Sequence, residues 1–472
     1  MIILGTNSIK DTGFNVANSL RFNSGSSDSL DRTVSSSPTN PDKFTISVWV
    51  KRSKLGSSQA IIGQYSDSNF RAKLQFIADD KLEYYQVNDG SASAQVRTTR
   101  VFRDTSAWYN IVMQYDSAQS TSSNRLKLYV NGTQETAFDN SSYPAQNLDG
   151  KLNQASVPLD IGQDGNSSLY FDGYMAEAVV IDGTALDPTS FGEFDEDSGI
   201  WKPIDVSGLT FGDDGFYLDF EESGTGTNAS GMGADTSGNT NHFAVANLTA
   251  IDQSTDTCTN NFATLNPLNY SSVSKTYSFG NTAITASASG SWNATLSNFA
   301  VSSGKWYTEY KITAVGSYSA IGVGYQPFNT NASAYVGSTF LVGEDTGSFG
   351  WRNNGARPQG GSNLSSWGTN DILMIAIDMD NQKLYFGKNG TWETSGDPTS
   401  GATGTGSIGN LTAGEDYLFV ICPRGGGTSV NFGSPSFAIS SGNTDGDGYG
   451  NFEYAVPSGY FSLNTKNLAE YG

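Results

Sequence analysis

The sequence predicts an all-β protein with two β-sandwich cores, and three observations carry this prediction. The stretch TNDILMIAIDMDNQKLYFGKNGTW, residues 369–392, reads as a buried strand at residues 372–378, a polar turn, and a second strand at residues 383–388 that ends at Asn-Gly. Apolar residues on both faces of the first strand place it inside a sheet, and Asn-Gly is a strong hairpin-turn signal. Residues 108–133, with WYNIVMQYD followed by NRLKLYVNGT, hold a similar hairpin in the first half of the chain. The third observation is composition, because 54 glycines and 12% aromatic residues are typical of many short strands and turns.

Chain length, net charge and cysteine content indicate the size of these cores and the environment of the protein. A chain of 472 residues is too long for one ordinary core, and two sandwiches of about 200 residues each, with connecting segments, account for it. The net charge of −21 repels phosphate backbones and anionic membranes, so nucleic-acid binding is not expected. The apolar run at the start, MIILGTNSIKDTG, is shorter than the apolar core of a signal peptide. No apolar run in the sequence is long enough to span a membrane, so we expect a soluble protein made in a cytosol. The two cysteines, Cys258 and Cys422, fall in different predicted units and are expected to be buried thiols, not a disulfide.

The first sandwich is expected over residues 19–200, after a polar, Asn-rich arm at residues 1–18. Strand-like segments follow one another here at the short, even spacing of antiparallel strands. The segments that carry a resemblance are SVWVKRS, WYNIVMQYD, LKLYVNGT, LDIGQ and YFDGYMAEAVVIDGTALDPTSF. In this order they resemble the laminin-G, or concanavalin-like, jelly roll, and the resemblance implies that fold for the first half of the chain.

Residues 201–274 are expected to form an irregular, partly stranded bridge between the two sandwiches. They repeat the start of such a domain, an apolar strand and an Asp-x-Ser-Gly-Asn-x-Asn turn, but no complete second jelly roll follows. Tyr217–Phe220 is predicted to add one strand to a sheet. DTCTNNFATLNPLNY, residues 256–270, reads as a polar connector.

The second sandwich is expected over residues 275–436. Its strand-like segments include GKWYTEY, IGVGY, GW followed by NG, the hairpin at residues 369–392, and NFG. This order resembles the SPRY domain, which implies a second concanavalin-like sandwich. The predicted fold class is therefore all-β, with two concanavalin-like jelly-roll β-sandwiches joined by the bridge.

The tail, residues 437–472, is rich in aromatic and turn residues and is expected to pack on a sandwich. Together with TNNFATLNP and DTSGNTNHF, it resembles virion structural proteins of tailed bacteriophages, which carry such modules in tail fibres and other surface appendages. The resemblance implies a protein made in the bacterial host cytoplasm and placed on the virion surface. Its implied partners are other virion proteins and a host-surface glycan or receptor, without membrane insertion. Fibre proteins are often trimeric, so a homotrimer is expected by analogy.

Residue types suited to hydrolysis are present but poorly arranged. The one histidine, His242, lies in a polar GNTNHF turn without a nucleophile elbow, so a hydrogen-bonded turn histidine is favoured over a catalytic base. Some jelly-roll glycosidases use Glu-x-Asp-x-x-Glu on one strand, where alternate residues face the same cleft. The closest segment here is Glu193–Ser198, in which Ser198 occupies the position of the third acid. The segment follows Pro188 and is expected to lie in a loop. A solvated acidic turn is the favoured interpretation, and the chain is not predicted to be an enzyme.

A calcium site is the only cofactor site that the sequence suggests. Asn443, Asp445 and Asp447 are spaced two apart with glycines between and after the acids, as at the start of an EF-hand loop. Tyr454 stands where that loop would carry its bidentate glutamate. A Gly/Asp turn without metal is the alternative. The turn that holds Asp235 could offer oxygens in the same way.

Loops at one rim of the second sandwich are the predicted recognition surface. SPRY-like domains usually bind through such loops, and aromatic rings with planar guanidinium groups suit sugars or peptides. The candidate residues are Tyr318, Tyr335, Trp351, Arg352, Arg357 and Trp367. Trp351 and Trp367 could instead be core aromatics, which leaves Tyr318, Tyr335 and Arg357 as the better surface candidates.

The function that the resemblance implies is non-enzymatic binding of a host-surface glycan or protein by a tail fibre or another appendage. The alternative is a decoration or assembly protein that contacts only other virion chains. A polysaccharide depolymerase is a third possibility, which is disfavoured because the carboxylates and the histidine are not placed as catalytic residues.

Overall fold

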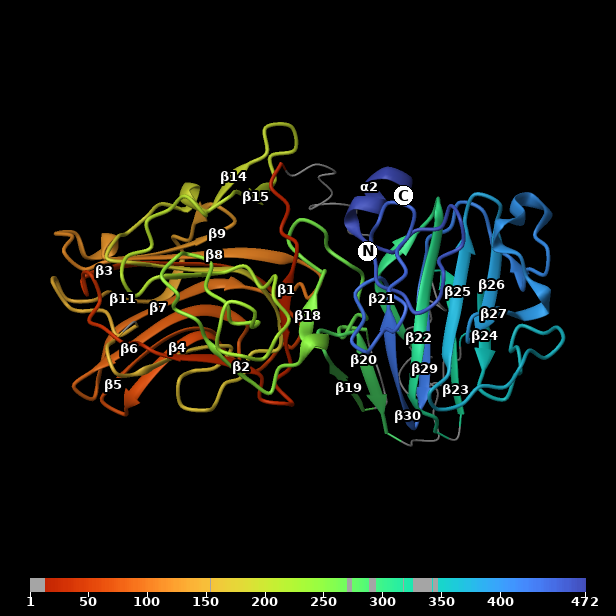
Figure 1. The fold of residues 1–472 in the computed structure, drawn as a ribbon, viewed down its shortest axis with the longest axis horizontal. Coiled ribbons are helices and arrows are strands. Elements are labelled where there is room, and N and C mark those ends of the chain that lie inside the picture. Colours follow the sequence, from red (N-terminus) through yellow and green to blue (C-terminus); the bar gives the residue numbers. More distant parts are fainter. Residues whose placement is uncertain are drawn as a thin grey trace. The chain divides into compact units, whose positions relative to one another are not determined.

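The computed structural model describes residues 13–152, 154–269, 274–287, 294–316, 318–325, 342 and 347–472. Its contacts divide the chain into two compact units: a first unit that ends at Thr259 and a second unit that runs from Asn260 to Gly472. Figure 1 shows that strands make up both, coloured from red to green in the first unit and from green to blue in the second. The predicted all-β class with antiparallel sandwiches is confirmed. No helix of the described residues is long and apolar enough to cross a membrane.

The first unit is a sandwich of two eight-stranded sheets, A and B, with a separate two-stranded hairpin. Sheet A has the order β10 (Thr133–Gln134), β9 (Leu126–Val130), β8 (Trp108–Asp116), β3 (Lys43–Arg52), β13 (Gly173–Asp182), β1 (Ser19–Phe22) and β18 (Gln253–Ser254), with β16 (Phe216–Leu218) also paired to β13. Sheet B has the order β11 (Phe138–Ser142), β7 (Ser91–Val101), β6 (Lys81–Asn88), β5 (Phe70–Phe76), β4 (Gln59–Asp67), β12 (Pro158–Ile161), β2 (Ser29–Thr33) and β17 (Ala244–Ala246). The hairpin joins β14 (Gly192–Phe194) to β15 (Trp201–Pro203), and short 3-10 helices are η1 (Ser122–Asn124), η2 (Pro188–Ser190) and η3 (Ala250–Asp252).

Alternation along the strands explains how the two sheets share one core. In sheet B, Leu30, Leu74 and Leu159 belong to the central cluster, and their neighbours in sequence point to the opposite, outer face. Sheet A is covered on both sides, because its outer face packs against Val206 and Phe211 from the segment that follows the hairpin. Both faces of sheet A are therefore buried, while the outer face of sheet B carries polar side chains.

The segment expected to be a bridge, residues 201–274, is divided between the two units. Its first part, up to Thr259, adds β16, β17 and β18 to the sheets of the first unit, so the strand predicted near Tyr217 is confirmed. The buried Lys51 Nζ lies 2.7 Å from Asp256 Oδ2, and such a pair holds because each charge offsets the desolvation of the other. Both cysteines are buried thiols outside any disulfide, as predicted.

The second unit is a sandwich of an eight-stranded sheet C and a four-stranded sheet D. Sheet C has the order β19 (Lys275–Ser278), β20 (Ala283–Ala286), β30 (Gly426–Asn431), β22 (Lys305–Ala314), β25 (Ile372–Asp378), β26 (Lys383–Lys388) and β27 (Thr391–Trp392), with β28 (Gly409–Asn410) also paired to β26. Sheet D has the order β21 (Thr295–Val301), β29 (Tyr417–Arg424), β23 (Tyr318–Tyr325) and β24 (Ser348–Arg352). The other elements are η4 (Glu393–Ser395), η5 (Pro398–Thr403) and the helix α2 (Thr465–Tyr471).

The C-terminal tail covers the outer face of sheet C. Phe452 and Tyr460 of the tail pack with Tyr307 and Tyr385 of the sheet. The buried carboxylate of Glu309 accepts hydrogen bonds from the backbone N–H groups of Glu453 and Tyr454, at 3.0 and 2.8 Å. The tail is thus held by both apolar contact and a buried acceptor.

Candidate functional site

Two of the predicted rim aromatics belong to the core of the second unit. Trp351 is 0% exposed and Trp367 is 5% exposed, and both lie in the central cluster between sheets C and D. The Trp351 ring stacks on Phe386 with centroids 5.8 Å apart, and its Nε1 donates to the backbone oxygen of Ser365 at 3.0 Å. A ring without solvent contact cannot receive a ligand, so the core interpretation of these tryptophans replaces their assignment to a binding surface.

The other rim candidates are not assembled into one site by the described residues. Tyr335 lies outside the described residues, and Tyr318 begins β23. Arg352 is half-buried and ends β24, where it is paired with Ala320. The Arg357 guanidinium donates to the backbone oxygen of Ile408, and burial lowers its pKa. Their role in binding stays a prediction, and Arg357 already has a role in holding its loop.

The predicted calcium loop has Asp445 at the centre of a hydrogen-bond network. Its Oδ1 accepts from the backbone N–H groups of Asp447 and Tyr449, at 3.1 and 2.9 Å. Its Oδ2 accepts from the backbone and hydroxyl of Ser462, at 2.9 and 2.6 Å, and from Asn467 Nδ2 at 2.8 Å. Both oxygens are therefore occupied by protein donors, and the network supports the metal-free alternative.

The companions of Asp445 are engaged as well. Asn443 Nδ2 donates to the backbone oxygen of Phe452, and Asp447 Oδ2 accepts from the Tyr471 hydroxyl at 3.0 Å. Among the residues that the structure describes, no group of three or more His, Cys, Asp or Glu side chains is placed to hold a metal ion. The calcium hypothesis stays a prediction, to be tested against a structural role for Asp445.

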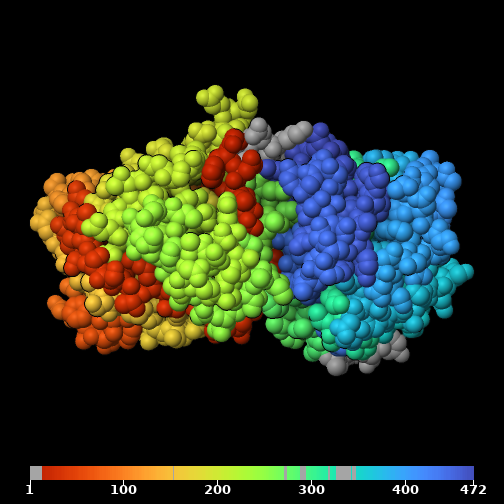
Figure 2. Space-filling model, in the orientation of Figure 1, coloured from red at the N-terminus to blue at the C-terminus, as the bar shows by residue number. Residues whose placement is uncertain are grey.

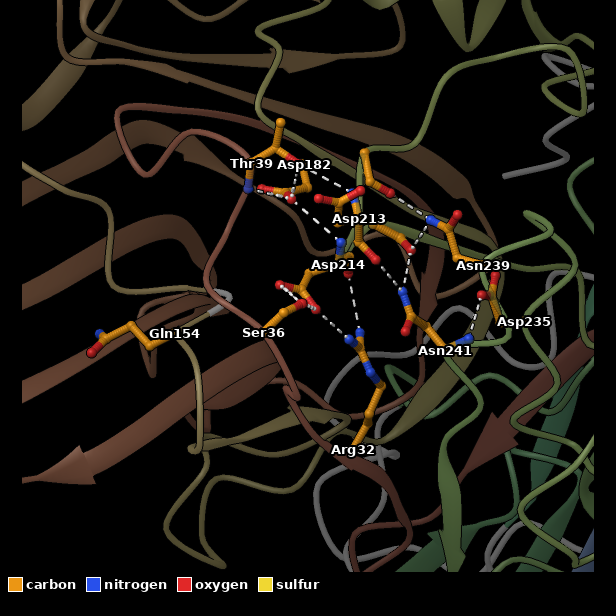
Figure 3. A network of polar contacts seen from close by, with 12 residues as sticks. Arg32, Ser36, Thr39, Gln154, Asp182, Asp213, Asp214, Asp235, Asn239 and Asn241 are labelled. Carbon is orange, nitrogen blue, oxygen red and sulfur yellow. Dashed lines mark hydrogen bonds and ion pairs between the residues drawn. The ribbon is translucent and has the colours of Figure 1, made fainter.

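The turn that holds Asp235 is likewise a structural hub, shown in Figure 3. Asp235 Oδ1 accepts from the backbone of Tyr217 at 2.9 Å, and Oδ2 accepts from the backbone of Asn241 at 2.7 Å. The only histidine, His242, accepts through Nδ1 a hydrogen bond of 3.0 Å from the Asp235 N–H. This contact places the histidine in the turn, as the sequence favoured.

The same network ties residues 212–215 to the start of the sandwich (Figure 3). Arg32 donates through Nη2 to Asp214 Oδ1 at 3.0 Å, and Asp182 Oδ2 accepts from the Thr39 hydroxyl at 2.7 Å. Burial is the largest effect on both members of the ion pair, lowering the pKa of Arg32 and raising that of Asp214. Since each carboxylate has protein donors, this network fixes the fold and leaves little free capacity for a ligand.

The acidic segment Glu193–Ser198 forms the hairpin between β14 and β15, which projects from the surface of the first unit in Figure 2. Asp195 Oδ1 accepts from the backbone and hydroxyl of Ser198, at 2.9 and 2.7 Å. Lys202 Nζ lies 3.4 Å from carboxylate oxygens of both Glu193 and Asp195. The contacts are those of a solvated acidic turn.

The outer face of sheet B presents the arrangement best suited to binding, and the sequence analysis did not identify it. Strand pairing places one residue of each strand in a row across all eight strands. From β17 to β11 the row is Ala244, Asp31, Asp160, Gly63, Lys73, Tyr85, Gln95 and Ser142. Because the alternate residues of these strands fill the core, this row points away from it. Polar side chains dominate it.

One end of the row holds two carboxylates on neighbouring strands. Asp31 of β2 and Asp160 of β12 are direct partners, and such partners have Cβ atoms about 4.5–5.5 Å apart. Asp160 is 3% exposed and Asp31 is half-buried. Gln163 Nε2 donates to Asp160 Oδ1 at 2.7 Å. Burial, and next the charge of Asp31, raise the pKa of Asp160 to about 7.

The other end of the row is a network of compensated charges. Glu83 lies beside the row and accepts from Gln75 Nε2 at 2.7 Å and from Gln95 Nε2 at 2.8 Å. Arg97 Nη2 lies 2.7 Å from the same carboxylate. Tyr85, whose side chain is half-exposed, is the strand partner of Gln95 and so lies beside this network. Such a mixture of a ring and fixed hydrogen-bonding groups suits the ring face and hydroxyls of a sugar.

A glycine separates the two ends. A Cβ on Gly63 would lie 2.6 Å from the carbonyl carbon of Asp164, so the backbone after β12 crosses the sheet at this position. Asp164 Oδ2 lies 3.6 Å from Lys73 Nζ and Asp164 Oδ1 accepts from the Ser168 hydroxyl at 3.0 Å. The crossing loop therefore divides the face into an acidic end and a mixed end.

The sequence signal for this face was weak but present. In SLDRT and PLDI, aspartates alternate with core leucines, which marks them as outward-facing. Their pairing joins strands that are far apart in the chain, and this cannot be read from either segment.

Comparison with known proteins supports the fold of the first unit. Residues 23–189 match the family model described as the Concanavalin A-like lectin/glucanases superfamily. No curated protein matches the chain.

Solved structures similar to parts of the chain include domains of different kinds. The SPRY domain of human HERC1 is 16% identical, with 35% of this chain and 96% of that chain covered and a TM-score of 0.27. A heptameric SAP-like pentraxin from Limulus polyphemus is 15% identical, with 37% and 79% covered and a TM-score of 0.27. Domain 4 of AbnA, a GH43 extracellular arabinanase from Geobacillus stearothermophilus, in complex with arabinotriose, is 18% identical, with 33% and 65% covered and a TM-score of 0.24.

Proposed function

We propose that this protein binds a carbohydrate through the outer face of sheet B and does not cleave it. The observation that supports the proposal is the row of polar side chains across one sheet, flanked by the Glu83 network. Carbohydrate ligands are bound by side chains whose hydrogen-bonding directions are fixed in advance, which is what such a network supplies. The family model that matches residues 23–189 covers lectins as well as glucanases.

Binding without hydrolysis is favoured by the placement of the acids. A glycosidase needs two carboxyl groups that both reach the scissile bond. Asp160 is nearly covered and hydrogen-bonded to Gln163, while Glu193 and Asp195 belong to an exposed turn with Lys202. Neither pair offers two carboxyl groups that are both free of protein partners.

The biological setting of the proposal comes from the sequence resemblance. We place the protein on a tailed-bacteriophage virion, in a tail fibre or another surface appendage, where the ligand is a host-surface glycan. The second candidate is a decoration or assembly protein whose surfaces contact only other virion chains.

The test is a glycan array probed with the purified full chain, followed by calorimetry on each glycan that binds. We expect saturable binding that falls about tenfold, or ~1.4 kcal/mol, in Tyr85→Ala, because the half-exposed ring stacks on the sugar. Tyr170→Ala is the matched control, since Tyr170 is half-exposed in the same unit but outside the row.

Four outcomes separate the alternatives. Binding that survives Tyr85→Ala would move the site to the loops of the second unit, and an absence of any glycan binding would refute the proposal. Tight association with other virion proteins in place of glycan would favour the assembly role. Release of shorter oligosaccharides from a bound polysaccharide would show that the protein is an enzyme.

A further inference from the structure

We infer that the acidic end of the sheet B face accepts a protonated amino group, so that the preferred ligand is an amino sugar with a free amine. This inference rests on the proposed glycan binding by the same face. It assigns one subsite, formed by Asp31, Asp160 and Gln163, to a primary ammonium group.

The first argument is the charge balance of the subsite. Like charges directly opposite each other on neighbouring strands are destabilising, and Asp31 and Asp160 are such partners. None of the ion pairs found among the described residues includes either aspartate. At the other end of the face, by contrast, Glu83 pairs with Arg97. The acidic end therefore lacks the cation that its neighbours have.

The second argument is an unused acceptor beside the pair. Gln163 is 8% exposed, and its Oε1 is buried without a hydrogen-bond donor. Nε2 of the same amide donates to Asp160 Oδ1 at 2.7 Å, so this amide group lies against one of the two carboxylates. A buried acceptor without a donor is destabilising, so a donor brought by a ligand recovers the missing hydrogen bond.

The third argument concerns which donor fits. Asp31, Asp160 and Gln163 Oε1 offer acceptors, and a primary ammonium carries three N–H donors with no acceptor. Calcium instead takes six to eight oxygens, and no metal-holding group of acidic, histidine or cysteine side chains is found in the part of the chain that the structure describes. The net charge of −21 also attracts a cationic ligand at long range.

The raised pKa of Asp160 agrees with these contacts. Burial and the unpaired charge of Asp31 favour its neutral form near pH 7. A bound ammonium removes the second of these effects, so ligand binding is expected to release a proton near neutral pH. Beyond the loop at Gly63, the mixed end of the face can hold the hydroxyls of the adjoining sugars.

The experiment compares the glucosamine tetramer with its N-acetylated form and with the neutral glucose tetramer. Calorimetry with the full chain, at a pH at which the free amine is protonated, measures each affinity. We expect the free amine to bind at least about tenfold more tightly than the N-acetylated form, because only the free amine forms charged hydrogen bonds with the carboxylates. The advantage should shrink as salt rises.

Asp31→Asn and Asp160→Asn should abolish this preference while leaving the melting temperature unchanged or raised, since each removes one of two like charges. Asp197→Asn, on the exposed hairpin, makes the same chemical change and should keep the preference. Should Asp160→Asn fail to fold, the Asp31→Asn variant alone tests the inference, because Asp31 is half-buried and takes no part in the buried contact between Gln163 and Asp160.

Equal binding of all three tetramers, or equal competition by polylysine, would overturn the inference. Binding of only neutral or N-acetylated glycans would overturn it while the proposed function stands. Failure of every glycan to bind would overturn both.

Discussion

Glu177 is a buried carboxylate whose removal has a calculable effect on stability. It lies in β13, at a register irregularity between Ala176 and Val179, with φ 50°. The residue is 6% exposed, and the Tyr217 hydroxyl donates to Oε2 at 2.6 Å. Burial is the main cause that raises the pKa of Glu177 to about 8.

The magnitude follows from linkage between protonation and folding. A carboxyl pKa of 4.5 in the unfolded chain and about 8 in the folded unit corresponds to about 5 kcal/mol. Because the folded pKa is the higher one, the stabilising contribution is complete below pH 4.5 and is lost as the pH rises toward 8. Glu177→Gln cannot ionise and still offers Tyr217 an acceptor. We therefore expect the variant to match wild type in acid and to exceed it by several kcal/mol near pH 8.

The assay must report on the first unit alone. Urea unfolding at several pH values, followed by hydrogen exchange of a peptide that covers β13, gives that unit's free energy of unfolding. Glu193→Gln is the matched control, because Glu193 is exposed on the hairpin and should show no pH-dependent difference from wild type. A stability difference between Glu177→Gln and wild type that stays constant with pH would refute the raised pKa and the reasoning built on it.

Three further predictions address other parts of the molecule. Asp445→Ala should destabilise the second unit by about 3 kcal/mol, because buried donors of Ser462 and Asn467 lose their acceptor. EDTA should leave the wild-type melting temperature unchanged, and a large decrease with EDTA would favour a bound calcium ion. Gly63→Ala should displace the crossing loop at Asp164, lowering the free energy of unfolding by about 1–3 kcal/mol and the glycan affinity several-fold in calorimetry. An unchanged stability and affinity would show that this loop moves aside without cost and does not shape the binding face. Trp351→Ala should cost about 3–5 kcal/mol in chemical denaturation, and a cost near zero would contradict its place in the core.

Local sequence patterns predicted much of the fold. The strands expected at residues 372–378, 383–388 and 108–116 are β25, β26 and β8 with the same bounds. Each depends on side-chain alternation and on a turn dipeptide, which are properties of a few consecutive residues. The division of the bridge at Thr259 was not predicted, because its strands are short and gain their stability from sheets formed by other segments.

Site prediction from residue type was less successful. An aromatic residue in a turn-rich segment reads the same whether its ring is exposed or fills a core, and Trp351 and Trp367 proved to be core residues. The spacing of Asp445 and Asp447 fits both a calcium loop and a hydrogen-bonded turn. Only the donors that surround Asp445 distinguish the two.

By itself the sequence determined the all-β class, the two sandwiches and the outward direction of residues such as Asp31 and Asp160, because alternation is local. Tertiary structure alone decided that these two aspartates are partners, since β2 and β12 meet only when sheet B closes. It also decided that Gly63 lies beneath a crossing loop. A binding face depends on which strands are neighbours, and that order is set by long-range pairing of the backbone, which no short stretch of sequence records.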